Sequence, residues 1–244
     1  MRLKGRVALV TGGAKRIGRA IALALASRGA HVAITYLSSP SEATATVRAI
    51  ERKRVKGLAL RVDQRDGSQV RAAAREILSR FRRVDVLINN ASSFYPTPWL
   101  EVADSQWDDL LQTNLVGPWR FIQALAPVMK RQGAGKIVNI ADVAAFSPWG
   151  NYLPYCAAKG GLVTLTKGLA KVLAPAVQVN AVAPGPILFP PGLSSRERQA
   201  AVRRTLLRRA GSPEDIVQAV LFFLEGSDFV TGAVLPVDGG RLLA

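Results

Sequence analysis

The feature that most restricts the fold of this chain is the alternation of short apolar segments with longer segments of helical periodicity, from one end of the sequence to the other. Short apolar runs are typical of strands buried on both faces, and a helix between two of them makes the crossover that parallel strands require. The alternation therefore predicts an α/β fold, a doubly wound parallel sheet of seven strands with helices on both faces. The predicted strands are residues 6–11, 31–36, 57–62, 84–89, 136–140, 178–183 and 233–237. The predicted helices are residues 17–28, 41–54, 66–81, 105–131, 152–173, 194–209 and 213–225.

Nothing in the sequence divides this pattern into parts. The 244 residues contain no linker, repeat or low-complexity tract, so we expect residues 1–244 to form a single domain. No apolar run approaches the roughly 20 residues that span a bilayer, and the N-terminus leads directly into a strand, so we expect no signal peptide. The single cysteine has no internal partner, and the single histidine argues against a histidine-ligated metal site. We therefore expect a soluble cytoplasmic protein without a structural metal and without membrane contact.

One predicted helix contains two prolines. Pro118 and Pro127 both lie within residues 105–131. Proline has no backbone N–H and its ring clashes with the preceding turn, so this helix is predicted to kink or break.

The charge of the chain is strongly positive. Its formal net charge is +16 and its isoelectric point is near 11, which suits a nucleic-acid partner. The arginines and lysines, however, scatter over predicted helical faces, for example through residues 71–83. No zinc-finger spacing or aromatic–glycine RNA motif accompanies them. We therefore expect no nucleic-acid ligand and favour anionic small ligands or partners.

A glycine-rich turn, residues 11–18, joins the first predicted strand to the first predicted helix. Glycine permits a tight turn and a close approach of the backbone to phosphate, and a helix N-terminus favours negative charge. After the first strand of an alternating chain, such a turn predicts a dinucleotide cofactor. The residues expected to contact it are Gly12, Lys15, Arg16, Ile17 and Gly18.

The end of the second predicted strand indicates which dinucleotide is bound. An acidic residue there would accept hydrogen bonds from a ribose 2′-hydroxyl and repel a 2′-phosphate. Here the strand ends in Tyr36, Leu37, Ser38 and Ser39. No carboxylate follows before Glu42, and the glycine-rich turn adds two cations. The sequence therefore favours NADPH over NADH, with these four residues among its contacts.

A tyrosine and a lysine four residues apart, Tyr155 and Lys159, lie near the start of the long helix after the fifth predicted strand. This spacing puts both side chains on one face of the helix. A lysine cation close to a phenol favours the phenolate. We therefore expect Lys159 to lower the pKa of Tyr155 and to prepare it for proton transfer near neutral pH.

These features resemble the short-chain dehydrogenase/reductase family over essentially the whole chain. The glycine-rich turn follows the family pattern Thr-Gly-x-x-x-Gly-x-Gly, except that Arg16 stands at the middle glycine. The resemblance implies a Rossmann-type fold, catalysis by Tyr155 and Lys159, and a water relay to Lys159 supported by Asn114. It also implies that Lys159 holds the nicotinamide ribose. The further cofactor contacts that the resemblance implies are Asp63, Gln64, Asn90, Ala91, Pro184, Gly185 and Ile187.

Three places resemble one branch of this family, the pteridine reductases: Asp142, Arg16 and the segment 90–96. Most of the family has a serine at the position of Asp142, where it donates a hydrogen bond to a carbonyl oxygen. An ionised carboxylate cannot donate that bond, but it can accept bonds from an amino-pyrimidine edge or pass a proton to the catalytic tyrosine. The resemblance implies that Phe94 stacks on a pterin, that Ser92 binds both the pterin and the cofactor phosphates, and that Arg16 lies beside the substrate.

We therefore expect NADPH-dependent reduction of a pterin or dihydropterin, with Tyr155 protonating the ring nitrogen beside the carbon that receives the hydride. Asp142 and Lys159 would support this step. The alternative is a 3-oxoacyl-[acyl-carrier-protein] reductase, suggested by the basic segment 188–210, which is expected to cover the substrate. Asp142 in place of serine argues against it. A non-catalytic NADP-binding regulator is a third hypothesis, and the intact tyrosine–lysine pair argues against that.

The family resemblance also implies a homotetramer, in which the helices 105–131 and 152–173 form one interface and the last strand forms another. The sequence leaves open which pterin or folate is the physiological substrate and what the strongly basic surface does. It also leaves open whether the tail 241–244 reaches a neighbouring subunit.

Overall fold

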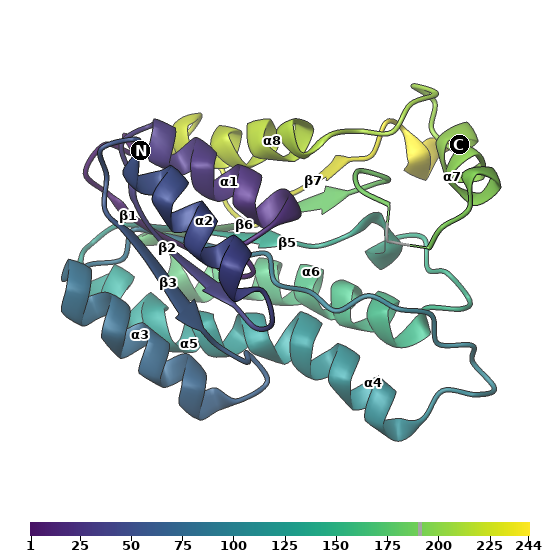
Figure 1. Ribbon diagram of the computed structural model, residues 1–244, viewed down its shortest axis with the longest axis horizontal. Helices are drawn as coiled ribbons and strands as arrows, with labels where there is room; N and C mark the ends of the chain where they lie inside the picture. Colours follow the sequence, from purple (N-terminus) through teal and green to yellow (C-terminus); the bar gives the residue numbers. More distant parts are fainter. Residues whose placement is uncertain (190–191) are drawn as a thin grey trace.

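The protein is described by a computed structural model over residues 1–189 and 192–244, and its centre is a parallel sheet of seven strands (Figure 1). The strand order is β3-β2-β1-β4-β5-β6-β7. Every neighbouring pair is parallel, so all the carboxyl ends meet at one edge. The strands are β1 Val7–Val10, β2 His31–Tyr36, β3 Gly57–Arg61, β4 Val86–Asn89, β5 Gly135–Ile140, β6 Val177–Pro184 and β7 Val234–Val237. The predicted doubly wound, Rossmann-type single domain is confirmed.

Helices cover both faces of the sheet. In Figure 1, α1, α2 and α8 lie on one face, and α3, α4, α5 and α6 lie on the other. The helices are α1 Arg16–Ser27, α2 Pro40–Glu51, α3 Gly67–Phe81, α4 Asp104–Leu111, α5 Gly117–Arg131, α6 Leu153–Leu173, α7 Ser195–Arg203 and α8 Pro213–Glu225. Three short helical turns complete the description: η1 Gln112–Val116, η2 Val143–Ala145 and η3 Arg241–Leu243.

The sheet separates two hydrophobic cores. Successive side chains of a strand point to opposite faces, so Ala8 and Val10 of β1 join the core beneath α1 and α8. Val7 and Leu9 join the core beneath α3 and α5. This burial on both faces is the reason why the strands read as continuous apolar runs in the sequence.

The predicted helix 105–131 is interrupted by a π-helical turn. The turn η1 separates α4 from α5, and Pro118 lies in the first turn of α5. Because Pro118 has no N–H to donate, the regular hydrogen-bonding pattern changes just before it. α5 continues through Pro127, so only the first of the two prolines interrupts the helix.

The predicted basic helix 194–209 is shorter in the structure. α7 begins after Ser194, whose side chain forms a capping box with Glu197. It ends at Arg203, and Arg208 adopts a left-handed backbone conformation with φ of 52°. Within the described ranges, no helix combines the length and the apolar character needed to cross a membrane.

Candidate active site

One cleft of about 1800 Å³ follows the carboxyl ends of the strands. The strand order reverses between β1 and β4, which is where doubly wound sheets open a ligand crevice. The predicted site residues that line this cleft are Gly12, Lys15, Arg16, Ile17, Gly18, Tyr36, Leu37, Ser38, Ser39, Asp63, Gln64, Asn90, Ala91, Ser92, Phe94, Asp142, Tyr155, Lys159, Pro184, Gly185 and Ile187. Asn114 is the exception, because it is fully buried behind the lining residues.

The glycine-rich turn has a shape that suits phosphate binding. Gly12 has φ of 61°, and a Cβ atom on Gly18 would clash with the Gly12 carbonyl oxygen. The turn is tied to the end of β4, because Asn90 Nδ2 donates to the Thr11 carbonyl at 2.8 Å. Arg16, at the family's middle glycine, also adopts a left-handed conformation, with φ of 54°. That conformation costs a non-glycine residue roughly 1–2 kcal/mol, so Arg16 is held there by its surroundings.

The end of β2 offers hydroxyl groups and cations. Ser38 and Ser39 line the cleft there. Arg61, which ends β3, is in register with Tyr36, and its Nε donates to the Leu37 carbonyl at 3.2 Å. Arg61 is not among the residues that line the cleft but adjoins the end of β2, and an exposed arginine at a strand end has no local signature in the sequence. Backbone N–H groups, hydroxyls and guanidinium groups are donors, so this part of the cleft fits the phosphates of NADP(H).

The side chains of Asp63 and Gln64 are engaged within the protein. Arg65 bridges the carboxylates of Asp63 and Asp109, with N–O distances of 2.7 and 2.5 Å. Gln64 Nε2 donates to the Thr113 carbonyl at 2.6 Å. Both predicted residues line the cleft. The bonds to Arg65 and to the Thr113 carbonyl hold their side chains in place.

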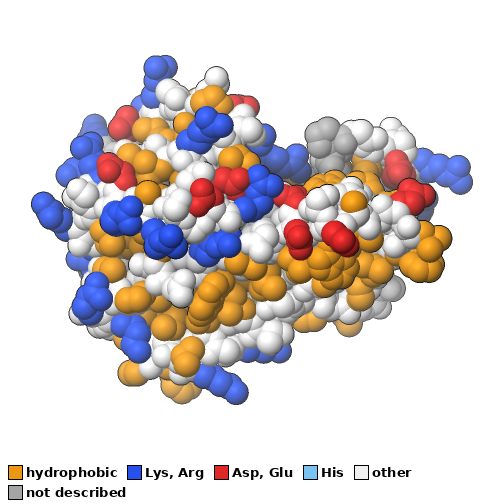
Figure 2. Space-filling model, turned by 90° about the horizontal axis from the view of Figure 1, so that it is seen from below, with side chains coloured by type: hydrophobic (Ala, Val, Ile, Leu, Met, Phe, Trp, Pro, Cys, Tyr) orange, Lys and Arg blue, Asp and Glu red, His pale blue; other side chains and the backbone are white. Residues whose placement is uncertain are grey.

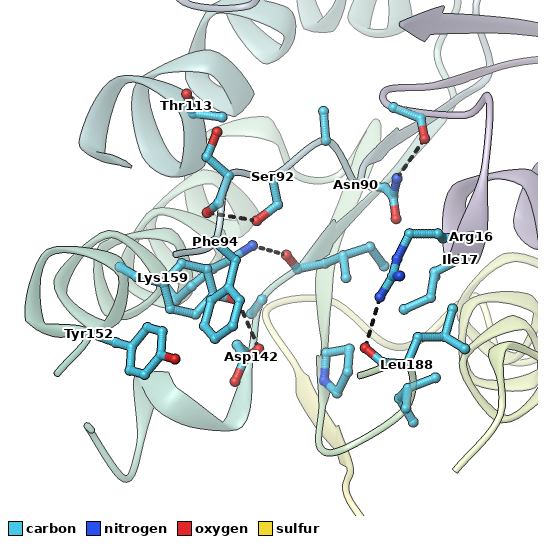
Figure 3. Close-up of a pocket in the computed structure, with 18 of the residues that line it drawn as sticks. Arg16, Ile17, Asn90, Ser92, Phe94, Thr113, Asp142, Tyr152, Lys159 and Leu188 are labelled. Atoms are coloured by element: carbon cyan, nitrogen blue, oxygen red, sulfur yellow. Dashed lines mark hydrogen bonds between the residues drawn. The ribbon is translucent and has the colours of Figure 1, made fainter. Parts of the chain in front are cut away.

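Tyr155 and Asp142 are joined directly. The Tyr155 hydroxyl donates to Asp142 Oδ2 at 2.8 Å, and Asp142 Oδ1 accepts from the N–H of Ala144 at 2.8 Å. Lys159 Nζ donates to the Ile140 carbonyl at 2.8 Å and lies 5.6 Å from the centre of the Tyr155 ring. In Figure 3, Phe94, Lys159 and Asp142 lie on one side of the view, and Arg16 and Leu188 lie on the other.

The expected lowering of the Tyr155 pKa by Lys159 is wrong for this arrangement. Burial and the neighbouring Asp142 carboxylate raise the pKa of Tyr155 well above its usual value. Burial also raises the pKa of Asp142, and it lowers the pKa of Lys159 to about 8. The physical reason is that desolvation penalises every charged form in a site this deep. Tyr155 therefore keeps its proton, as a proton donor must, and its hydroxyl donates to the Asp142 carboxylate.

Asn114 supports the loop after β4. Its Oδ1 accepts from Ser92 Oγ at 2.5 Å, and its Nδ2 donates to the Ser93 carbonyl at 2.9 Å. Its position in η1 places it behind this loop. The water relay from Asn114 to the lysine stays a prediction.

An aromatic wall stands beside the Tyr155 hydroxyl. Phe94, which is 37% exposed, stacks on Tyr152 with ring centres 4.7 Å apart and planes 2° apart. Its ring meets Tyr155 edge-on at 4.8 Å and Trp149 edge-on at 6.2 Å. Our sequence analysis missed Trp149 and Tyr152. Tyr152 is the residue immediately before α6, three positions before Tyr155 in the sequence.

The segment after β6 meets the glycine-rich turn across the cleft. Arg16 Nη2 donates to the Leu188 carbonyl at 2.8 Å (Figure 3). Residues 190 and 191 of the predicted substrate-covering segment lie outside the described residues. Arg204, just after α7, and Arg241, in η3, also line the cleft, and our sequence analysis assigned neither of them to the site.

The arrangement of the cleft agrees with comparisons with known proteins. A family described as "Enoyl-(Acyl carrier protein) reductase" matches residues 12–241. The 3-oxoacyl-[acyl-carrier-protein] reductase of Staphylococcus aureus is 36% identical over 240 residues, which cover 97% of this chain and 98% of that protein. This chain belongs to the short-chain dehydrogenase/reductase family. As a short-chain dehydrogenase/reductase it is an oxidoreductase.

Two further proteins are similar over the full length. The 3-oxoacyl-[acyl-carrier-protein] reductase of Thermotoga maritima is 34% identical, with 100% of both chains covered. A blue fluorescent protein from a metagenomic library, solved in complex with NADPH, is 36% identical with a TM-score of 0.91, and the match covers 99% of both chains. Arg16 and Asp142, the two positions at which the sequence is expected to depart from the family pattern, both line the cleft.

Proposed function

We propose that this short-chain dehydrogenase/reductase reduces a pterin or dihydropterin with NADPH. The observation that carries the proposal is Asp142, whose carboxylate meets the Tyr155 hydroxyl at 2.8 Å where the family pattern has a serine. An ionised carboxylate accepts hydrogen bonds and cannot donate one to a ketone oxygen. It therefore suits a substrate that presents amino and ring N–H groups.

NADP(H) is the cofactor. The neighbour solved with NADPH is 36% identical over almost the whole chain, and no carboxylate lines the cleft at the end of β2, where Tyr36, Leu37, Ser38 and Ser39 lie. The glycine-rich turn and the segment Pro184, Gly185 and Ile187 would hold the cofactor. When bound, NADPH supplies a hydride.

The protein supplies the proton. Tyr155 would donate its hydroxyl proton to the ring nitrogen beside the carbon that is reduced. The Asp142 carboxylate, whose pKa burial raises, would then take up a proton from water and pass it to the Tyr155 oxygen across their hydrogen bond. The Lys159 ammonium would stabilise the developing phenolate, and its hydrogen bond to Ile140 holds it in place.

The aromatic wall would position a flat ring. Tyr152 covers one face of Phe94, and the 37% of Phe94 that is exposed faces the cleft. A pterin would stack there, with Ser92 and Arg16 at its edges. Stacking of a nucleobase on an aromatic side chain is worth roughly 1–3 kcal/mol, whichever base is bound, because every base has a π-face. A pterin is also a flat heterocycle, so the same interaction would bind it.

A 3-oxoacyl thioester is the second candidate substrate. The named relatives from S. aureus and T. maritima are 3-oxoacyl-[acyl-carrier-protein] reductases at 36% and 34% identity. Sequence similarity therefore supports this candidate better than it supports a pterin. Asp142 and the aromatic wall favour the pterin, because a ketone needs a donor where an ionised carboxylate stands.

The test compares substrates with the wild-type enzyme. NADPH oxidation is followed with dihydrobiopterin, dihydrofolate and an acetoacetyl thioester, and Tyr155→Phe serves as the control that binds NADPH without the transferable proton. We expect turnover with the dihydropterins and loss of turnover in Tyr155→Phe. An enzyme inert toward both pterins and active on the thioester would establish the second candidate instead.

We further propose that the segment 188–210 covers the substrate and that the protein is a homotetramer. The contact of Arg16 with Leu188 supports the first proposal, because it joins this segment to the cofactor-binding turn. Exposed aromatic side chains on α4 and α5 support the second. A cytoplasmic location and the lack of a nucleic-acid ligand stay predictions.

A further inference from the structure

Two arginines from distant parts of the chain line the same cleft as the reacting groups. Arg204 directly follows α7, and Arg241 begins η3 after the last strand. Both belong to the cleft that contains Asp142 and Tyr155. Neither belongs to the glycine-rich turn or to the end of β2, where the cofactor phosphates are expected.

The guanidinium of Arg241 is held in place without an acidic partner. It lies 5.6 Å from the centre of the Trp149 ring, a cation–π distance, and its Nη1 donates to the Ala201 carbonyl at 3.3 Å. A guanidinium has five N–H donors, so most of its hydrogen-bonding capacity stays available for a ligand. The planar fork of donors matches a carboxylate or a phosphate.

Arg204 has no ion pair and no side-chain hydrogen bond within the described part of the chain. The other cleft arginines differ from it: Arg65 bridges two carboxylates, and Arg16 donates to a backbone carbonyl. The nearby acidic side chains are already engaged. Glu197 accepts from Ser194, and Asp238 accepts from the backbone N–H groups of residues 240 and 242.

The two positive charges act on each other, because Arg241 donates to the carbonyl of Ala201 in α7, three residues before Arg204. The pKa of Arg241 is lowered, mainly by burial and to a smaller extent by the positive charge of Arg204. The carboxylates of Asp142 and Asp238 act in the opposite direction. Two guanidinium charges on adjoining elements repel each other. An anion between them would replace that repulsion with two attractive contacts.

We propose that Arg204 and Arg241 form a subsite for an anionic group on the non-reacting part of the substrate, a carboxylate or a phosphate. The inference rests on the proposed function in placing the reacting ring or thioester at Tyr155, and it adds that the natural substrate carries negative charge. The glutamate carboxylates of a dihydrofolate and the phosphates of an acyl thioester carrier both provide this chemistry.

The test uses two pairs of substrates with the same reacting group. Dihydrofolate is anionic and dihydrobiopterin is neutral, and acetoacetyl-coenzyme A is anionic whereas acetoacetyl-N-acetylcysteamine is neutral. For each pair, we measure the ratio of KM for the anionic member to KM for the neutral member. The ratio is compared between wild type, Arg204→Ala, Arg241→Lys and the double variant Arg204→Ala/Arg241→Ala. Arg203→Ala, which removes a neighbouring positive charge outside the cleft, is the matched control.

We expect the ratio to rise about tenfold in Arg204→Ala and further in the double variant, and to stay constant in Arg203→Ala. Tenfold corresponds to about 1.4 kcal/mol. A rise confined to the folate pair identifies a carboxylate, and a rise confined to the thioester pair identifies a phosphate. Ratios within twofold of wild type in both pairs would overturn the subsite.

The subsite and the proposed function fail separately. Turnover of thioesters without turnover of pterins rejects the pterin proposal. The KM ratio of the two thioesters in the arginine variants then still tests the anionic subsite. If no compound is turned over, the dissociation constant of each compound from the enzyme–NADPH complex is measured by calorimetry. The ratio of the dissociation constants of the anionic and neutral members then replaces the KM ratio. Failure of all four compounds to bind overturns both proposals.

Discussion

Asp142 touches both Tyr155 and the N–H of Ala144, so its two carboxylate oxygens have different partners within the protein. The bond from the Ala144 N–H orients the carboxyl group, and the bond from Tyr155 joins it to the proton donor. A serine at this position would present a hydroxyl donor to a ketone, whereas the Asp142 carboxylate presents an acceptor that can also pass protons to Tyr155. A single side chain thus changes which edge of a substrate the site complements.

The first prediction concerns this residue. Asp142→Ser removes the hydrogen-bond acceptor and the carboxylate that passes a proton to Tyr155. We therefore expect the kcat/KM for dihydropterins to fall at least a hundredfold, within the range of general acid–base contributions. The thioester rate should rise or stay level. Phe94→Ala is the companion variant, in which the lost stacking should weaken pterin binding by roughly 1–3 kcal/mol and spare NADPH. Steady-state kinetics with both substrates measure the changes, and an unchanged pterin rate in Asp142→Ser would exclude the proposed role.

The second prediction concerns pH. Burial lowers the pKa of Lys159 to about 8, so the ammonium is charged below pH 8 and loses its proton above it. Because the charged form stabilises a phenolate at Tyr155, kcat/KM should fall about tenfold per pH unit above that point. A pH–rate profile of the wild type measures this. In Lys159→Arg the cation does not titrate, so the descending limb should disappear in whatever activity this variant retains.

The third prediction concerns cofactor choice. Arg61 is exposed and donates to the Leu37 carbonyl at the end of β2, where the ribose 2′-position is read. Arg61→Ala should raise the Kd for NADPH about three- to tenfold, because it removes one charge-assisted contact in a solvated position. The Kd for NADH should not change. Cofactor fluorescence titrations measure both, with the exposed Arg75→Ala on α3 as control, and equal losses for the two cofactors would assign Arg61 a structural role.

At the scale of secondary-structure elements, irregularity is concentrated where the site is built. The π-helical turn η1 places Asn114 against the loop after β4. The left-handed Arg16 begins α1 and reaches the segment after β6. The regular strands and helices bury apolar side chains, and these departures from regularity position polar atoms at the cleft.

A fourth prediction tests how β1 and β4 are joined away from the cleft. Asp85, fully buried before β4, accepts hydrogen bonds from Arg6, Arg83 and the Val7 N–H at 3.0, 2.6 and 2.9 Å. Asp85→Asn should lower the free energy of unfolding by about 1–3 kcal/mol, as measured by urea denaturation at pH 7. Activity per folded molecule should not change.

The pH dependence of this effect has a defined sign. Burial alone would raise the pKa of Asp85, but the hydrogen bonds from Arg83 and Val7 and the two arginine charges outweigh it, so the pKa is lowered. A lowered carboxyl pKa contributes stability that is present above the unfolded value of about 4 and is lost as the pH falls through the folded value. The difference between wild type and Asp85→Asn should therefore shrink below about pH 4. A constant difference down to pH 3 would contradict this account.

At the scale of the whole molecule, apolar side chains gather on one outer face. Figure 2 shows hydrophobic side chains across the side of the molecule covered by α4, α5 and α6. Trp107, Trp119 and Leu153 from these helices are 39–41% exposed. Tryptophan on a contiguous apolar face is typical of a protein–protein interface.

The fifth prediction follows from this face. We expect light scattering at micromolar concentration to give four times the 26.1 kDa of one chain. Trp119→Asp places a charge in the interface and should reduce the assembly, whereas Trp119→Phe keeps an apolar ring and should preserve it. A wild-type monomer at micromolar concentration would reject the homotetramer.

Much of the fold was predictable because its causes are local or periodic. Strands buried on both faces must be apolar throughout, so the seven strands were identified from short apolar runs. The glycine-rich turn and the Tyr155–Lys159 pair were found for the same reason, since close backbone approach and helical spacing leave marks within a few residues.

The contacts across the cleft depended on tertiary structure. Asn114 meets Ser92, and Arg241 meets Trp149, only because elements far apart in the chain end at one edge of the sheet. The pKa of Tyr155 rises because the site is deeply buried, and a four-residue spacing carries no information about burial. Local sequence therefore specified many of the chemical groups that line the cleft, and packing decided which further groups join them, which of them meet and in which protonation state.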